Sequence, residues 1–138
     1  FLDSLSSNST KFMEFFEIVD VDVTEADIHD RLHLENIENY CESLFALEEG
    51  KEVCAIASNW GEFQFRRDKI NGGIRLAMLD CPNALAWTMT TGFPPEPEKL
   101  VIHMTINRIE KDPEFLEEIR EFLLDLKSGL KAYLVPTS

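Results

Sequence analysis

Residues 61–78, GEFQFRRDKINGGIRLAM, contain the clearest structural pattern in this chain. In both halves of the stretch apolar and polar side chains alternate, which is the two-residue period of a β-strand with one buried face. Asn71, Gly72 and Gly73 stand between the halves, and such residues supply the positive φ angles that a tight hairpin turn requires. The stretch therefore predicts an antiparallel β-hairpin.

Strand patterns continue on both sides of this hairpin. Val53 to Ala57 is a continuous apolar run, typical of a strand covered on both faces. Two alternating segments follow the hairpin, separated by a proline-rich loop at 92–98. Their apolar positions are Leu85, Trp87 and Met89 in the first and Leu100, Ile102, Met104 and Ile106 in the second. We therefore expect five strands, joined by short connections into a mainly antiparallel meander.

The N-terminal third has the three-to-four-residue spacing of amphipathic helices. We expect helices over 9–19, 24–32 and 34–48. The second begins at a capping box with Asp in place of Glu, and the third ends at Gly50. The apolar positions are Phe12, Phe15, Phe16 and Val19, then Ile28 and Leu32, then Leu34, Ile37, Cys41 and Leu44.

A last helix is expected from Asp112-Pro113, because Asp is a good N-cap and proline fits the first helical position. The predicted fold is α+β: N-terminal helices, a five-stranded sheet and a C-terminal helix in two layers. A chain of 138 residues buries about two-thirds of its unfolded surface, enough for one core. We expect a single domain over 1–138, in which residues 1–8 need not be ordered.

The net charge of −13 is concentrated near the N-terminus. Residues 1–52 contain fourteen Asp and Glu against three Lys and Arg, and most of these carboxylates fall on the outer faces of the expected helices. Such a surface attracts basic partners and repels polyanions, so we expect a basic protein partner and no nucleic acid. The predicted partner-binding residues are Asp27, Asp30, Glu35, Glu38, Glu42 and Glu49.

The three cysteines, Cys41, Cys54 and Cys81, lack C-x-x-C spacing and lie in or beside apolar segments. Reduced core thiols and a cytoplasmic location are therefore expected. The first residues lack the basic and apolar regions of a signal peptide, and no apolar run reaches the length of a membrane span. We predict neither targeting nor membrane association.

No motif in the sequence is specific for a reaction. His29 and His33 have the spacing of a zinc-peptidase helix, but Asp30 is shorter than the general-base Glu and no third ligand is evident, so a solvated helix edge without metal is favoured. Phosphate-binding loops, dinucleotide motifs, nucleophile elbows and EF-hand loops are absent. We predict no catalytic residue and no cofactor.

Strand alternation places a second set of polar residues on the face of the sheet opposite the core. An ordinary, mildly basic solvent face is the favoured interpretation, and a ligand or partner surface is the alternative. Trp60 and Phe93, in two turn-rich loops, are candidate anchors, although lids over the ends of the core are more expected. The polar set is Gln64, Arg66, Arg75, Thr88, Thr90, His103, Thr105 and Asn107, with Arg66, Arg75 and His103 as candidate binding residues.

Three classes of function fit these patterns. The favoured class is an acidic protein-binding module, most concretely a bacterial inhibitor of the immunity or antitoxin type that neutralises a basic toxin such as a nuclease. The alternatives are a small-molecule sensor or adaptor using the outer sheet face, or a secretion-chaperone-like domain. A small enzyme is least supported, because His103 has no identifiable nucleophile or orienting acid. The remaining explanation of the net charge is that the acidic residues only keep the protein soluble.

Overall fold

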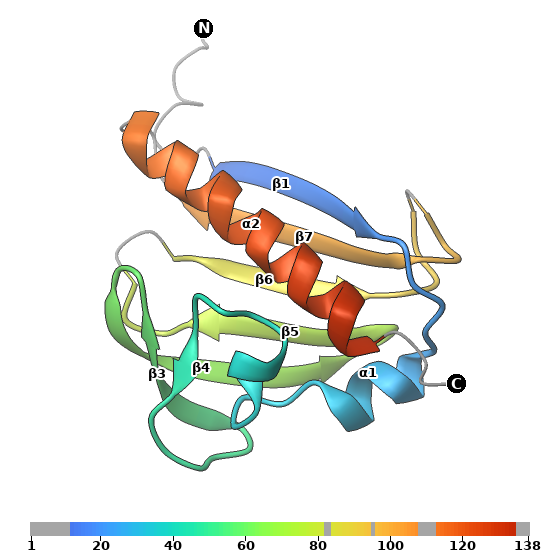
Figure 1. The fold of residues 1–138 in the computed structure, drawn as a ribbon, viewed down its shortest axis with the longest axis horizontal. Coiled ribbons are helices and arrows are strands. Elements are labelled where there is room, and N and C mark those ends of the chain that lie inside the picture. The colour runs from blue at the N-terminus through green and yellow to red at the C-terminus, as the bar shows by residue number, and fades with distance from the viewer. Residues whose placement is uncertain (1–11, 82–83, 95, 108–112, 135–138) are drawn as a thin grey trace, which may run out of the picture.

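The computed structural model describes residues 12–81, 84–94, 96–107 and 113–134. Its described part contains one seven-stranded antiparallel sheet, a long helix across one face and a short helix beside it (Figure 1). The strands are β1 Phe12–Val19, β2 Phe45–Ala46, β3 Val53–Ser58, β4 Gly61–Ile70, β5 Gly73–Met78, β6 Ala86–Thr90 and β7 Leu100–Asn107. The helices are α1 Glu25–Arg31 and α2 Pro113–Leu134, with a single 3-10 turn, η2, at Ile37–Asn39.

The strand order is β1-β7-β6-β5-β4-β3-β2, so each strand from β2 to β7 pairs with the next along the chain. The predicted hairpin is β4 and β5, in which Ile70 pairs with Gly73 and Gly72 has a φ of +87°. The five predicted strands are present as β3 to β7, and their meander is confirmed. The predicted count of five is wrong, because β1 and β2 extend the sheet at its two edges.

The helix predicted over 9–19 is wrong, since its described part is strand β1, which pairs with β7 along its whole length. Alternation is broken here in three places. Glu17 occupies a core-side position, where it pairs with Lys127 of α2 at 3.3 Å, and Phe16 and Ile18 occupy the outer face. As a result, the apolar residues have a spacing that resembles that of a helix. Pairing with the distant strand β7, and not this spacing, determines the structure.

The helix predicted over 34–48 is also wrong, although its four apolar positions are buried as expected. Side-chain hydrogen bonds replace the helical ones. The Asn36 side-chain oxygen accepts from the backbone of His33 at 3.0 Å, and the Glu38 carboxylate accepts from the backbone of Ala46 at 3.1 Å. Asn and Asp side chains compete with helical bonding in this way, which the apolar spacing alone does not reveal.

The helix predicted over 24–32 is confirmed as α1. The Thr24 hydroxyl accepts from the Asp27 backbone and the Asp27 carboxylate accepts from the Thr24 backbone, both at 3.0 Å, which completes the expected capping box. The C-terminal helix is confirmed from Pro113 onward, and its predicted cap, Asp112, lies outside the described residues, as does the segment 1–8. Among the described helices none combines the length and apolarity needed to cross a membrane.

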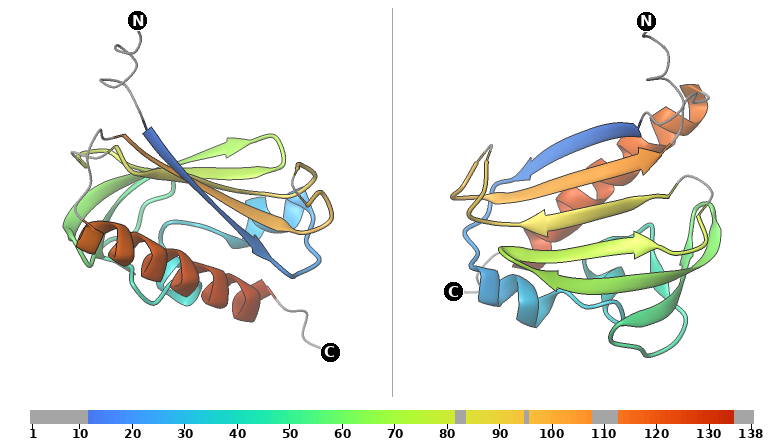
Figure 2. Two further views of the ribbon diagram at one scale, coloured as in Figure 1. Left: turned by 90° about the horizontal axis from the view of Figure 1, so that it is seen from above. Right: turned by 180° about the vertical axis from the view of Figure 1, so that it is seen from behind.

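Two elements lie over one face of the sheet, α2 and the segment 32–52, and α1 adds Ile28 to the same core (Figures 1 and 2). These two elements are attached to one another. The Asp125 carboxylate accepts hydrogen bonds from the backbone and hydroxyl of Ser43, and a Cβ added at Gly129 would overlap the carbonyl oxygen of Tyr40. No described element covers the opposite face, which the rear view in Figure 2 shows. The protein therefore has one covered and one open sheet face.

Candidate functional site

The predicted acidic residues divide into a structural group and an exposed group. Asp27 closes the α1 capping box and Glu38 binds the backbone of Ala46, so these two carboxylates stabilise the fold. The other four lie not on a helical face but on the end of α1 and the irregular segment that follows it. These four are exposed and form no ion pair among the described residues: Asp30, Glu35, Glu42 and Glu49.

Glu48 and Glu52 join the exposed group, and the charge concentration in the sequence could have included them. We name residues 30–52 the acidic segment. It contains two basic residues, Arg31 and Lys51. The Arg31 guanidinium donates to the carbonyl of Tyr133 at 2.6 Å and lies 4.9 Å from the centre of its ring. The acidic segment therefore carries six exposed carboxylates, none in an ion pair among the described residues, against these two cations.

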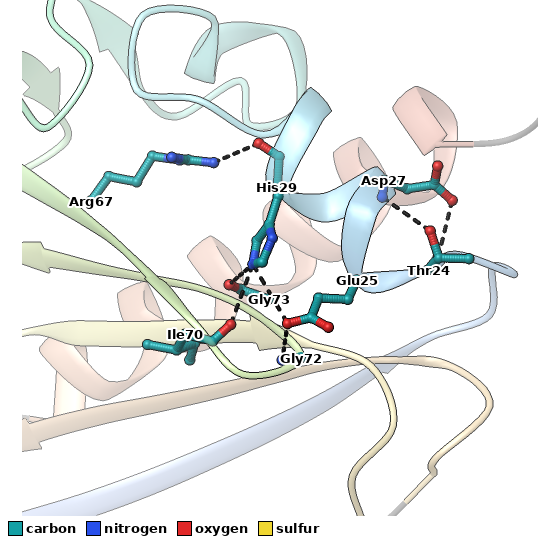
Figure 3. Close-up of polar contacts among 8 residues, drawn as sticks. All are labelled: Thr24, Glu25, Asp27, His29, Arg67, Ile70, Gly72 and Gly73. Atoms are coloured by element: carbon teal, nitrogen blue, oxygen red, sulfur yellow. Dashed lines mark hydrogen bonds and ion pairs between the residues drawn. The ribbon is translucent and has the colours of Figure 1, made fainter.

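Polar contacts attach α1 to the hairpin of β4 and β5 (Figure 3). The Glu25 carboxylate accepts from the Gly72 backbone at 2.9 Å, and the His29 Nε2 lies 2.8 Å from the Gly73 carbonyl oxygen. Arg67 donates to the carbonyls of His29 and Leu32 at 2.8 Å each, satisfying acceptors at the end of the helix. Burial lowers the pKa of Arg67. These contacts fix the position of α1 and, with it, the start of the acidic segment.

His29 in α1 and His33, just after the end of α1, contact different backbone carbonyl groups. His29 contacts Gly73, whereas the Nε2 of His33 lies 2.7 Å from the backbone oxygen of Asp30. In the part of the chain that the structure describes, no three His, Cys, Asp or Glu residues are grouped so as to hold a metal ion. The i,i+4 spacing is explained by local structure.

The strand register brings the predicted polar set together on the open face. Arg75, Thr88 and His103 are direct neighbours across β5, β6 and β7. The His103 ring stacks on Phe16 at 4.4 Å between centroids, and its Nε2 lies 2.7 Å from a Glu14 carboxylate oxygen. This strand, β1, was absent from the predicted sheet, so sequence reasoning could not place Phe16 and Glu14 here.

An open hollow of about 240 Å³ lies between Arg75 and His103. It exists because Ala86, beside these larger residues, is small. Arg75 is exposed and forms no ion pair among the described residues, whereas Arg66 pairs with Asp68 at 3.2 Å. The expected basic character of this face is wrong, since Glu14, Glu62 and Asp68 share it. The lining residues are Arg75, Ala86, Trp87, Thr88, His103 and Thr105.

The two candidate aromatic anchors pack against the fold. Trp60 lies 5.9 Å from the Phe115 ring and 5.6 Å from the Phe122 ring, and its Nε1–H donates to Glu118 at 2.9 Å. It thereby fastens the β3–β4 turn to α2. Phe93 lies against Gly72 of the hairpin turn and remains 44% exposed. Trp60 therefore acts as a lid over the end of the core, whereas the Phe93 side chain remains partly exposed.

Two of the three cysteines are placed so that they are poor nucleophiles. Cys41 and Cys54 are buried, Cys81 is half-buried, and all three are free. Burial, together with the nearby Asp125 carboxylate, raises the pKa of Cys41. A buried thiol with a raised pKa is a poor nucleophile, because the thiolate is the reactive form.

In the described part of the chain, β1 forms a free edge of the sheet, which sequence reasoning missed. A groove of about 390 Å³ lies between this strand and α2. Phe16 and Leu124, on its two sides, are each 53% exposed. The sequence signal of this strand is the alternation of Met13, Phe15 and Val19, which Phe16 and Glu17 interrupt. The groove lining is Glu14, Phe15, Phe16, Glu17, Arg120, Leu123 and Leu124.

Comparison with known proteins identifies the fold. No protein-family model matches the chain, and no curated protein matches it in sequence. It is similar to the crystal structure of an uncharacterised protein from Bacillus thuringiensis, with a TM-score of 0.58 and 12% sequence identity, over 90% of this chain and 99% of that chain. At this identity the similarity shows a shared α+β fold alone.

Proposed function

We propose that this protein is an acidic protein-binding module of the cytoplasm that neutralises a basic protein, such as a nuclease toxin, by direct binding. The observation that supports the proposal is the group of six exposed, unpaired carboxylates on the acidic segment. A concentrated field of one sign steers an oppositely charged partner and raises its association rate by roughly 10- to 1,000-fold.

The acidic segment is held on the fold rather than free in solution. Asp125 binds Ser43, Tyr40 packs over Gly129, and Arg67 binds the carbonyl of Leu32. A surface that is ordered before binding loses less conformational entropy in the complex. This arrangement suits an inhibitor that covers a basic active site.

A charge-reversal experiment tests the proposal. The protein is used to capture partners from cells that encode it, at low and at high salt. We expect wild type to capture a basic protein at low salt and to inhibit its activity. The triple variant Glu35→Lys, Glu42→Lys, Glu49→Lys should lose at least roughly tenfold in affinity.

The matched control is Glu62→Lys, Glu96→Lys, Glu98→Lys, which changes the net charge equally at exposed sites outside the acidic segment. This control should retain most of the binding. Equal loss in both triple variants would mean that only net charge matters. Salt-independent capture, unaffected by either variant, would contradict the proposal.

The open hollow supports a second candidate, a sensor or adaptor for a small organic anion. Arg75 without an ion-pair partner, the Thr88 hydroxyl and the His103 imidazole line the same hollow. Guanidinium groups bind carboxylates and phosphates with paired hydrogen bonds. Citrate or inorganic phosphate should then raise the melting temperature of wild type but not of Arg75→Ala, with Arg66→Ala as the matched control. An equal shift in all three proteins would contradict this candidate.

A further inference from the structure

The free edge of β1 has one feature that protects edge strands, the core-side charge of Glu17, which pairs with Lys127 of α2, and it lacks the protection given by short length, Lys, Pro or bulges. Natural proteins make such edges short, place Lys or Pro in them, or interrupt them with bulges, because unpaired N–H and C=O groups accept further strands. β1 has eight residues, FMEFFEIV, without Lys, Pro or Gly. Its register with β7 is continuous from Phe12 to Val19. Among the described residues, no strand pairs with its other side.

The groove next to this edge has apolar side chains on both walls. It is lined by four successive β1 residues, 14–17, which point alternately to the two faces, and by the side of α2 that carries Leu124. An added strand would lie about 4.8 Å from β1. Its side chains would point alternately toward Leu124 on the helix side and toward Phe16 on the open face.

Charge indicates which strand fits there. Glu17 of β1 already pairs with Lys127, which leaves Glu14, in contact with His103 on the open face, and Glu117 and Glu121 on the exposed side of α2, near Arg120. A second copy of the chain, paired antiparallel through β1, would bring together two such edges and two chains of net charge −13. Like charges opposite one another destabilise a strand pair. Lys or Arg side chains complement this edge.

We propose that an extended basic segment of the partner protein adds to the free edge of β1 as an eighth strand. The apolar side chains of that segment lie on the helix side against Leu124, and its Lys or Arg side chains lie on the open face beside Glu14 and Phe16. Backbone hydrogen bonds supply affinity in this mode, and alternate side chains supply selectivity. The inference takes from the proposed function only the basic nature of the partner, since β1 and the acidic segment are at different edges of the sheet.

The test uses a blocked synthetic octapeptide of alternating lysine and valine as the probe. Hydrogen exchange of the full chain, read by NMR, should show protection of β1 amides on peptide addition and no change in β2 and β3. Leu124→Lys and Phe16→Lys should each weaken binding at least roughly tenfold. Leu47→Lys is the matched control, because Leu47 is 46% exposed beside β2 at the opposite edge.

The outcomes separate the edge proposal from the proposed function. Equal binding by Leu124→Lys, Phe16→Lys and wild type would overturn the edge proposal, as would equal binding of an alternating glutamate and valine peptide. Sedimentation of wild type as a dimer that Leu124→Lys converts to a monomer would assign the edge to a second copy. If the edge variants retain capture of the basic protein while the triple variant of the acidic segment loses it, the proposed function stands and the edge proposal fails.

Discussion

The two edges of the sheet end in different ways. β2 has two residues, and the Glu38 carboxylate occupies the backbone N–H of Ala46. The acidic segment continues from this edge over the core and is fixed to α2 by Asp125 and Gly129. β1, at the other edge, has eight residues and an apolar groove beside it. The difference indicates that the β2 edge contributes to stability, while the outer side of β1 has no strand partner among the described residues.

Substitutions at the two edges should therefore have different measurable effects. Changes around the β2 edge should alter the free energy of unfolding, because polar and packing contacts there hold a covering layer. Changes at exposed positions along the β1 edge should leave that free energy nearly unchanged and alter binding.

Gly129→Ala should destabilise the protein by about 2–3 kcal/mol, although alanine is normally the better helix residue. The added methyl would overlap the Tyr40 carbonyl, so the acidic segment must move away from α2. Urea unfolding measures the loss. Ser128→Ala, at an exposed neighbouring position, is the control and should match wild type. A stabilised Gly129→Ala would show that the segment is not packed on the helix.

Cys41 should react with a thiol reagent at least roughly a hundredfold more slowly than the half-buried Cys81. Cys41 lies in the acidic segment, and burial raises its pKa. Mass spectrometry after timed alkylation separates the sites. Comparable rates in the folded protein would mean that the β2 edge opens readily and would remove the contrast between the edges.

Asp125→Ala should cost about 1–2 kcal/mol, because the backbone N–H and hydroxyl of Ser43 lose their acceptor. Alanine favours the helix itself, so a loss must come from the contact between α2 and the acidic segment. Thermal unfolding compares this variant with Glu121→Ala, an exposed carboxylate one turn earlier. Equal melting temperatures for the two variants would contradict the predicted attachment.

The smallest effect concerns the end of the β1 edge, where Lys99 lies 2.7 Å from Asp20. The hydrogen bond and charge of Lys99 lower the pKa of Asp20 below its usual 3.8, and Asp20 raises the pKa of Lys99. The pair therefore stabilises the protein above the unfolded Asp pKa, and this contribution disappears as pH falls through the lowered folded value. Lys99→Gln should be slightly less stable than wild type at pH 7 and equal to it at pH 2. A difference that persists at pH 2 would argue against the pair.

The central strands could be predicted because their pattern is local. In β5, Ile74, Leu76 and Met78 alternate with Arg75 and Ala77, and both neighbouring strands are joined by recognisable turns. The α1 helix was predictable for the same reason, since its capping box lies within four residues. Alternation alone predicted the outer-face set, but not the three carboxylates, Glu14, Glu62 and Asp68, that share this face.

The two edges could not be predicted, because distant contacts define them. Glu17 in β1 is acceptable on the core side only because Lys127 lies opposite, and Ser43 leaves helical geometry because Asp125 binds it. The apolar spacing of 34–48 identified which side chains are buried but not the backbone conformation that buries them. The sequence therefore predicted four of the six exposed carboxylates, but not the conformation of the acidic segment that carries them.

The pairing of β1 with β7 also has a consequence for the order of folding. Val19 pairs with Leu100 and Phe12 with Asn107, so the first strand has no partner until most of the chain has left the ribosome. Closing so long a loop is slow compared with forming hairpins between consecutive strands. We expect the meander of β2 to β7 to assemble first and β1 to join it late, which pulsed hydrogen exchange during refolding would resolve strand by strand.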